Sequence, residues 1–173
     1  MTIVDTHCHA GMTKYEPVES LLRHMETSGV DQAVLIQYMG NTDNEYLADC
    51  LARFPGTLAA AMIVPEEDDG TAVRRWAESG IQGIRLRVNS RAAAADPLAQ
   101  WRAASQAGLV VSAPCRPEWL LSTEFLEVID TFPDLCIVIE HLGGMGTDAE
   151  APYDEFRRAL ERVSPRPNLS MKL

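Results

Sequence analysis

Short apolar runs and amphipathic segments alternate strictly along this 173-residue chain, and this alternation restricts its fold more than any other feature. The apolar runs predict strands at residues 2–8, 32–38, 57–64, 82–88, 109–114, 135–140 and 168–173. The segments between them predict helices at residues 17–28, 43–53, 70–79, 97–107, 118–131 and 153–163. Each strand with its helix takes roughly 25–30 residues, which is close to the size of one βα repeat.

The predicted strands are apolar along their whole length, as in residues 33–36 (Ala-Val-Leu-Ile) and 136–139 (Cys-Ile-Val-Ile). Such strands are covered on both faces, which is typical of a parallel sheet with helices outside it. Strict alternation favours a (β/α)8 TIM barrel over a doubly wound sheet. A complete barrel has eight units and about 250 residues. We therefore expect one incomplete domain, residues 1–173, a TIM barrel truncated after about seven strands that exposes apolar strand surface.

Glycines and prolines mark where the helices should end and begin. Gly29, Gly80 and Gly108 follow helical segments, where a left-handed residue commonly ends a helix. Pro97 and Pro117 stand near predicted helix starts, where a missing N–H costs little.

Charge and cysteine content exclude several classes of function. The net charge of −10 argues against nucleic acid or an anionic membrane as a partner. No apolar run reaches the ~18–20 residues of a membrane-spanning helix, and no signal-type segment opens the sequence. Four cysteines without CxxC spacing fit a reducing compartment. We expect a cytoplasmic protein with a small-molecule substrate, and the sequence is compatible with a homo-oligomer.

The first predicted strand ends in the most informative motif, Asp5-Thr6-His7-Cys8-His9. Side chains in a strand alternate between two faces, so Asp5, His7 and His9 should point the same way. Catalytic groups of a barrel gather at the carboxyl ends of its strands. The two imidazoles there suit one metal ion or one substrate. Asp5 is a candidate catalytic residue, and the alternative is that it holds a loop or a neighbouring backbone N–H.

His141 follows the sixth predicted strand and precedes Gly143 and Gly144. Two glycines permit a tight turn or a close backbone approach to a ligand. Imidazole is suited to proton transfer near neutral pH, so we predict that His141 is a general acid or base. The alternative is a loop histidine. Glu140 would point to the opposite side if the strand continued, which favours a structural role.

Arg85 and Arg87 alternate on the fourth predicted strand. Guanidinium groups in a buried strand need partners, and a substrate carboxylate or phosphate would serve. We predict that both arginines bind substrate. The alternative for Arg85 is an internal ion pair with Glu140 or Asp5. Lys172, near the end of the sequence, is expected to be solvated rather than to contact substrate.

These pieces together resemble the amidohydrolase-related (amidohydrolase 2) family of the TIM-barrel metal-dependent hydrolase superfamily. The resemblance runs over the whole chain in order and rests on residues 4–10, 83–86, 139–143 and 171–173. Its members include decarboxylases of aromatic or muconate-type acids and hydrolases of lactones. By this resemblance His7 and His9 would be metal ligands, and His141 would orient or deprotonate water or substrate.

The sequence departs from the family pattern at two strands. The fifth strand has no histidine near its end, only Cys115, and the eighth strand with its aspartate is not in this sequence. Two histidines alone rarely hold a catalytic metal. The departure is similar to a lactonase-like branch that works without a tightly bound metal. In that branch the histidines position the lactone, and Arg85 and Arg87 hold carboxylates.

We therefore expect a hydrolase of a small carboxylated lactone, ester or similar acid, acting by water activation at the barrel mouth. One alternative is a zinc- or manganese-dependent decarboxylase of the same fold, and another is a non-catalytic or inactive fragment. One divalent metal, zinc or manganese, is the candidate cofactor, and no organic cofactor is indicated. Residues 1–173 alone should show little or no turnover, because the eighth-strand acid is not among them.

Overall fold

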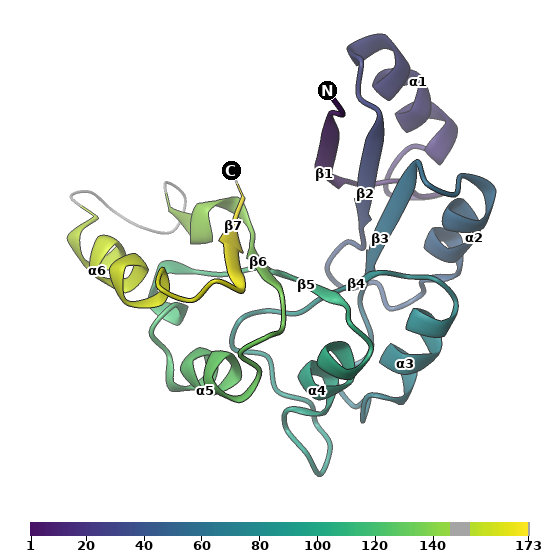
Figure 1. Ribbon diagram of the computed structural model, residues 1–173. Helices are drawn as coiled ribbons and strands as arrows, with labels where there is room; N and C mark the ends of the chain where they lie inside the picture. Colours follow the sequence, from purple (N-terminus) through teal and green to yellow (C-terminus); the bar gives the residue numbers. More distant parts are fainter. Residues whose placement is uncertain (146–152, 173) are drawn as a thin grey trace.

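The computed structural model describes residues 1–145 and 153–172 and contains one curved parallel sheet with helices on its outer side (Figure 1). Its strands are β1 (Val4–Cys8), β2 (Gln32–Ile36), β3 (Leu58–Met62), β4 (Gly83–Arg85), β5 (Val110–Ala113), β6 (Ile137–Ile139) and β7 (Leu169–Met171). The α-helices are α1 (Val18–Ser28), α2 (Glu45–Arg53), α3 (Thr71–Glu78), α4 (Ala99–Gln106), α5 (Thr123–Thr131) and α6 (Asp154–Val163). Single 3-10 turns lie at Pro117–Trp119 and His141–Gly144.

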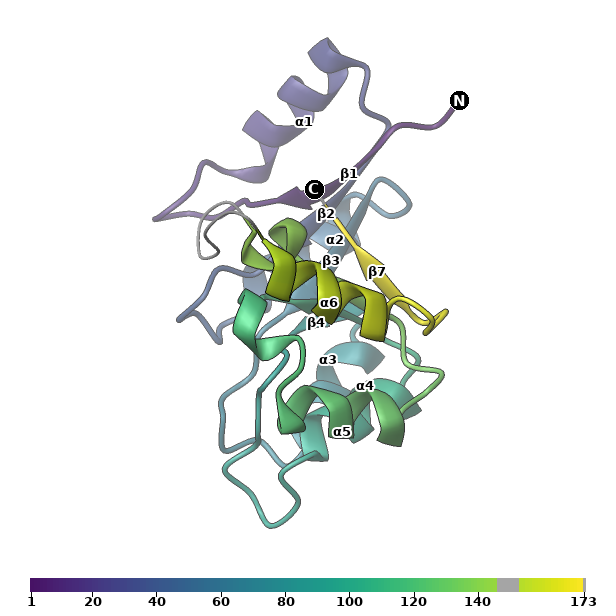
Figure 2. The same cartoon turned by 90° about the vertical axis from the view of Figure 1, so that its left-hand side faces the viewer.

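The strands are hydrogen-bonded in sequence order from β1 to β7, and every pair is parallel. A doubly wound sheet would reverse its strand order partway, so this order identifies an open part of a TIM barrel. The predicted fold class is confirmed. Figures 1 and 2 show β1 and β7 at the two edges of the sheet, with α1 to α6 around its outside.

The core fills the space between the sheet and the helices. Its largest fully buried side chains include Trp101 of α4, Phe125 of α5 and Leu35 of β2. At the first edge of the sheet, Ile3 and Val4 are 45% and 44% exposed, as expected for an open sheet. No helix in the described ranges is long and apolar enough to cross a membrane.

The helix ends agree with the sequence patterns except before α5. Gly29 ends α1 at φ 68°, and Gly80 and Gly108 also have positive φ after α3 and α4. The helix predicted to begin at residue 118 begins instead at Thr123. There the Ser122 side chain accepts a hydrogen bond from the Phe125 N–H and caps the helix. The predicted early start belongs to a separate 3-10 turn that begins at Pro117.

Candidate functional site

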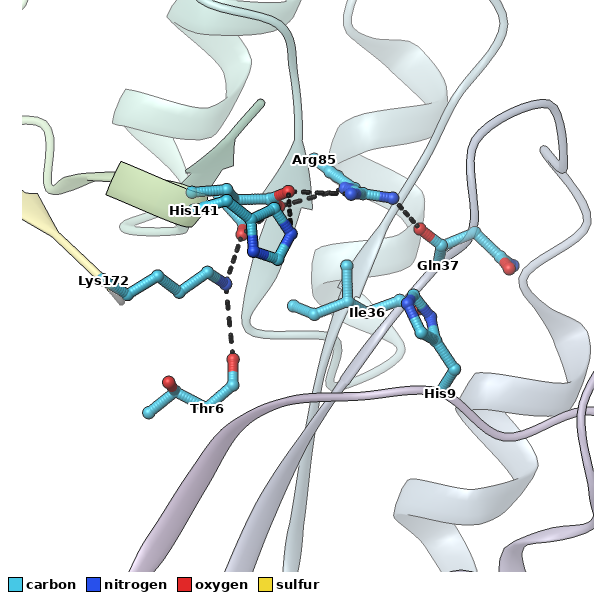
Figure 3. A network of polar contacts seen from close by, with 9 residues as sticks. Thr6, His9, Ile36, Gln37, Arg85, His141 and Lys172 are labelled. Atoms are coloured by element: carbon cyan, nitrogen blue, oxygen red, sulfur yellow. Dashed lines mark hydrogen bonds and ion pairs between the residues drawn. The ribbon is translucent and has the colours of Figure 1, made fainter. Parts of the chain in front are cut away.

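Four of the predicted site residues, together with Lys172, lie at the carboxyl ends of four strands. His7 lies in β1 and His9 directly after it, Arg85 ends β4, and His141 opens the turn after β6. Lys172 follows β7, and its side chain reaches the Thr6 carbonyl of β1 across the open side of the sheet (Figure 3). These positions confirm that the candidate residues share one end of the barrel, where barrel enzymes carry their chemistry.

The imidazoles of His7, His9 and His141 lie side by side. The ring centre of His7 is 5.1 Å from that of His9 and 4.8 Å from that of His141. His9 Nδ1 is 2.7 Å from the Ile36 carbonyl oxygen, to which it donates, so its Nε2 carries the lone pair. The His9 ring also stacks on Tyr15, with ring centres 4.5 Å apart and planes 14° apart. These two contacts fix the His9 ring.

A bulge in β1 changes how the first-strand motif is presented. Asp5 pairs with Ala33, but Cys8 pairs with Leu35, so three steps on β1 oppose two on β2. The simple alternation that placed Asp5, His7 and His9 on one face is therefore interrupted. The two histidines still meet, while Asp5 is exposed.

The exposed Asp5 side chain accepts a hydrogen bond from the backbone within the bulge. Its Oδ1 accepts the His7 N–H at 3.0 Å. This bond and one from the Cys8 thiol hold the pKa of the Asp5 carboxyl below its usual value. The alternative role considered for Asp5, holding a neighbouring backbone N–H, is confirmed. Its catalytic role stays a prediction.

His141 is presented by a left-handed turn. Its φ is 50°, that of Leu142 is also 50°, and Gly143 and Gly144 continue the turn at 64° and 80°. A Cβ at Gly143 would lie 3.2 Å from the Phe156 ring. The glycines after His141 therefore make a tight turn, and the His141 side chain is left 62% exposed.

Arg85 and Glu140 form a buried ion pair inside the sheet. Arg85 Nε and Nη2 donate to the two oxygens of Glu140 at 3.0 and 2.7 Å, and Nη1 donates to the Gln37 carbonyl at 3.0 Å (Figure 3). Ser112 Oγ donates to the same carboxylate at 2.6 Å. The side chains of Arg85 and Glu140 are 9% and 0% exposed. The internal ion pair considered for Arg85 is confirmed, and substrate binding by Arg85 stays a prediction.

Glu140 lies on the same side as His141, although strand alternation would place the two on opposite sides. Glu140 is still extended, at φ −78° and ψ 149°, and its N–H donates to the Ala113 carbonyl; alternation ends only at His141, where φ is 50°. Burial raises the pKa of the Glu140 carboxyl, but the hydrogen bonds from Arg85 and Ser112 outweigh it and the net pKa is lowered. Glu140 is therefore ionised at neutral pH, paired with Arg85.

Lys172 corrects the expectation of a solvated terminus. Its side chain is partly buried, with Nζ 3.2 Å from Ser112 Oγ and 3.4 Å from the Thr6 carbonyl oxygen (Figure 3). Burial lowers the pKa of this ammonium group. Sequence reasoning missed Lys172 because no pattern shows that the end of β7 faces β1.

Positive charge and burial keep the nearby histidines neutral. Burial, and then the charge of Lys172, lower the pKa of His7 to about 4, and burial also lowers the pKa of His9. A neutral imidazole can accept a proton or bind a metal ion. Arg87 is exposed and forms no ion pair with any residue in the described ranges, so its predicted role in substrate binding stays open.

One set of donors could hold a metal ion. One atom each of His7, Glu140 and His141 lie within 4.8 Å of one another, and the buried His7 Nδ1 has no hydrogen-bond partner among the described residues. Two imidazoles and a carboxylate suit zinc. The predicted ligand pair was His7 and His9; this set contains His7 but not His9. The fit is partial, because both Glu140 oxygens already accept bonds from Arg85.

Comparison with known proteins gives the family and the fold. Residues 4–173 match the profile of a protein family described as Amidohydrolase. No curated protein matches the chain. A probable 2-pyrone-4,6-dicarboxylic acid hydrolase from Acinetobacter baumannii, solved with citric acid bound, has a TM-score of 0.80 at 19% identity, over 99% of this chain and 68% of its own.

Two further solved structures share the fold. A Burkholderia multivorans amidohydrolase with bound zinc has a TM-score of 0.64 at 16% identity, covering 100% of this chain and 69% of its own. A 5-carboxyvanillate decarboxylase from Sphingomonas paucimobilis has a TM-score of 0.58 at 15% identity, covering 99% and 76%. At these identities the likeness establishes the fold and leaves the reaction open.

Proposed function

This chain belongs to the amidohydrolase family, and on that premise we propose that it hydrolyses a small carboxylated lactone or ester at the mouth of its barrel. The observation that carries the proposal is the row of three imidazoles beside an excess of positive charge. Arg85 and Lys172 bring two positive charges to one buried carboxylate, Glu140. Such surroundings favour an anionic substrate. The 2-pyrone-4,6-dicarboxylic acid named for the Acinetobacter structure is a substrate of this class.

The proposed reaction breaks the C–O bond of the lactone or ester and needs two proton transfers, one from the attacking water and one to the leaving oxygen. Water attacks the carbonyl carbon and gives its proton to a neutral imidazole, the C–O bond breaks, and the leaving oxygen takes up a proton. We assign the transfer to His141, whose exposed ring lies 4.8 Å from that of His7. His7 and His9 orient the carbonyl, and Asp5 positions His7 through its backbone N–H. Arg87, exposed two residues after β4, contacts a substrate carboxylate.

The test compares His141→Ala with His24→Ala in the protein as its gene encodes it. His24 is exposed on α1, away from the cluster, so it is a matched control. With 2-pyrone-4,6-dicarboxylate as substrate, we expect kcat of the His141 variant to fall by roughly 10²–10⁴ if it transfers the proton. The His24 variant should stay within about twofold of the parent, as a surface site should. A loss below tenfold at His141 would assign it to the loop and refute its catalytic role.

A metal-assisted reaction, such as decarboxylation of an aromatic acid, is the second candidate. It is favoured by the unpartnered Nδ1 of His7 beside Glu140 and His141. Those three residues would hold the ion, which would polarise a substrate oxygen or lower the pKa of a water molecule. Both Glu140 oxygens already accept hydrogen bonds from Arg85, so this reaction is the second candidate. Stoichiometric zinc or manganese, with activity lost on chelation and restored on re-addition, would replace the first proposal by this one.

The expectation that residues 1–173 alone have little or no turnover stays a prediction. Assay of those residues beside the gene-encoded protein tests it. Robust lactone hydrolysis by residues 1–173 would contradict it and would place all the required groups among the residues named above. No turnover by the gene-encoded protein, on either lactone or aromatic acid, would favour the non-catalytic alternative.

A further inference from the structure

Lys172 is the more buried of only two lysines in the chain. Lysine is rarely buried without a partner, because removing an ammonium group from water is costly. Here the ammonium lies between the Thr6 carbonyl and the Ser112 hydroxyl, at 3.4 and 3.2 Å. Because Thr6 directly precedes His7, this contact places the ammonium beside the histidine row, where its charge lowers the pKa of His7.

No carboxylate in the described part of the chain forms an ion pair with Lys172. Glu140 accepts two bonds from Arg85, and Lys172 donates to the Ser112 hydroxyl beside it, so that Lys172 and Glu140 attract each other without a hydrogen bond between them. Ser112 gives its single proton to Glu140 at 2.6 Å, so its oxygen accepts from Lys172. The Asp5 carboxylate also acts on Lys172, but from an exposed position where water and salt weaken the attraction.

An ammonium group has three N–H donors, and the described residues occupy two of those on Lys172. We propose that the third binds a carboxylate of the substrate, which makes Lys172 the residue that selects for negatively charged substrates. This inference rests on the proposed function, because that function identifies the bound anion as a carboxylate. Ser112 is then a positioning residue, because its oxygen holds the ammonium beside His7 while its proton is held by Glu140.

The pairing explains why a lysine, and not a third arginine, suits this place. The ammonium is a compact charge whose donors can turn toward a ligand while two bonds to the protein are kept. A guanidinium group is planar and would need a wider site. Charge selection by Lys172 is therefore expected to be sensitive to its replacement even by arginine.

The experiment measures binding, so it does not depend on turnover. Isothermal titration uses isophthalate, a planar dianion, and isophthalamide, its neutral counterpart. The parent protein is compared with Lys172→Met, Lys172→Arg and Ser112→Ala, and with Lys14→Met as the matched control. Lys14 is the other lysine of the chain and is exposed, with its ammonium group 4.7 Å from the Tyr38 ring centre.

A hydrogen bond between charged groups contributes enough that its loss should weaken isophthalate binding by roughly 10- to 150-fold in Lys172→Met. Lys172→Arg should lie between Lys172→Met and the parent, Ser112→Ala should weaken binding by a smaller factor than Lys172→Met, and Lys14→Met should stay within about twofold. Isophthalamide should bind the parent and Lys172→Met alike. Isophthalate binding by Lys172→Met within threefold of the parent would overturn the proposal, as would no measurable binding by the parent.

A second measurement needs no variant and guards against misfolding. The two lysines are acetylated with an N-hydroxysuccinimide ester, and the rate at each is followed by peptide mass spectrometry. Isophthalate should slow acetylation of Lys172 at least fivefold and leave Lys14 unchanged. Equal rates at Lys172 with and without isophthalate would refute the proposal. If isophthalate binds through Lys172 but no lactone is hydrolysed, the role of Lys172 is supported and the hydrolase proposal is refuted. If the lactone is hydrolysed and Lys172→Met does not change its turnover, the hydrolase proposal is supported and the role of Lys172 is refuted.

Discussion

Replacing Glu140 by glutamine should cost this protein a large part of its stability. The carboxylate is fully buried and accepts three hydrogen bonds, two from Arg85 and one from Ser112. The substitution keeps the size of the side chain but removes its charge, and it leaves the Arg85 guanidinium 9% exposed without a counter-ion. Removing one partner of a buried pair typically costs about 3–5 kcal/mol. We expect a loss of that size in the free energy of unfolding.

The measurement is urea unfolding at pH 7, followed by circular dichroism and tryptophan fluorescence. Arg85→Met and the double variant Arg85→Met/Glu140→Leu complete the set. Because an apolar pair of similar volume can replace a buried ion pair at little cost, the double variant should be more stable than Glu140→Gln. A loss below about 1 kcal/mol in Glu140→Gln would refute the reasoning. A double variant as unstable as the sum of the single changes would show that the two side chains are not coupled.

Two further predictions concern the turn after His141 and the Glu140 carboxylate. Gly143→Ala should destabilise the protein by about 1–2 kcal/mol in urea unfolding, because a Cβ at φ 64° is strained and would meet the Phe156 ring at 3.2 Å; Gly40→Ala, at φ 92° with open space around it, separates the backbone strain from the clash. The lowered pKa of Glu140 stabilises the folded state above the ordinary glutamate value of 4.5, and this contribution is lost as the pH falls through the folded-state pKa. The stability difference between the parent and Glu140→Gln should therefore be largest near neutral pH and shrink in acid, and a difference that stays constant down to pH 3 would contradict the lowered pKa.

The order of elements could be predicted from the sequence because it depends on local periodicity. Strands that are apolar on both faces, alternating with amphipathic helices, leave few arrangements other than consecutive parallel strands. The structure has its strands in that order, with bounds a few residues shorter than the apolar runs.

The sequence also located the site at the carboxyl ends of the strands, through His7, His9 and His141. It placed these residues correctly because a chemical group at a strand end is recognisable from neighbouring residues alone. The side-chain directions predicted from strand alternation were partly wrong. Strand alternation failed at two places, the bulge in β1 and the end of β6, since each depends on how a strand meets its neighbour.

Only the tertiary structure decided the charge relations of the site. Arg85 and Glu140 are 55 residues apart in sequence, and Lys172 and Thr6 are 166 apart. Arg85 and Glu140 pair across β5, which lies between β4 and β6. Lys172 reaches Thr6 because the sheet curves and brings the end of β7 toward β1. No local pattern records these relations. The sequence by itself therefore determined the order of the strands and the chemical groups at their ends. The tertiary structure decided that Glu140 is bonded to Arg85, and that the ammonium of Lys172 forms no ion pair with a carboxylate among the described residues.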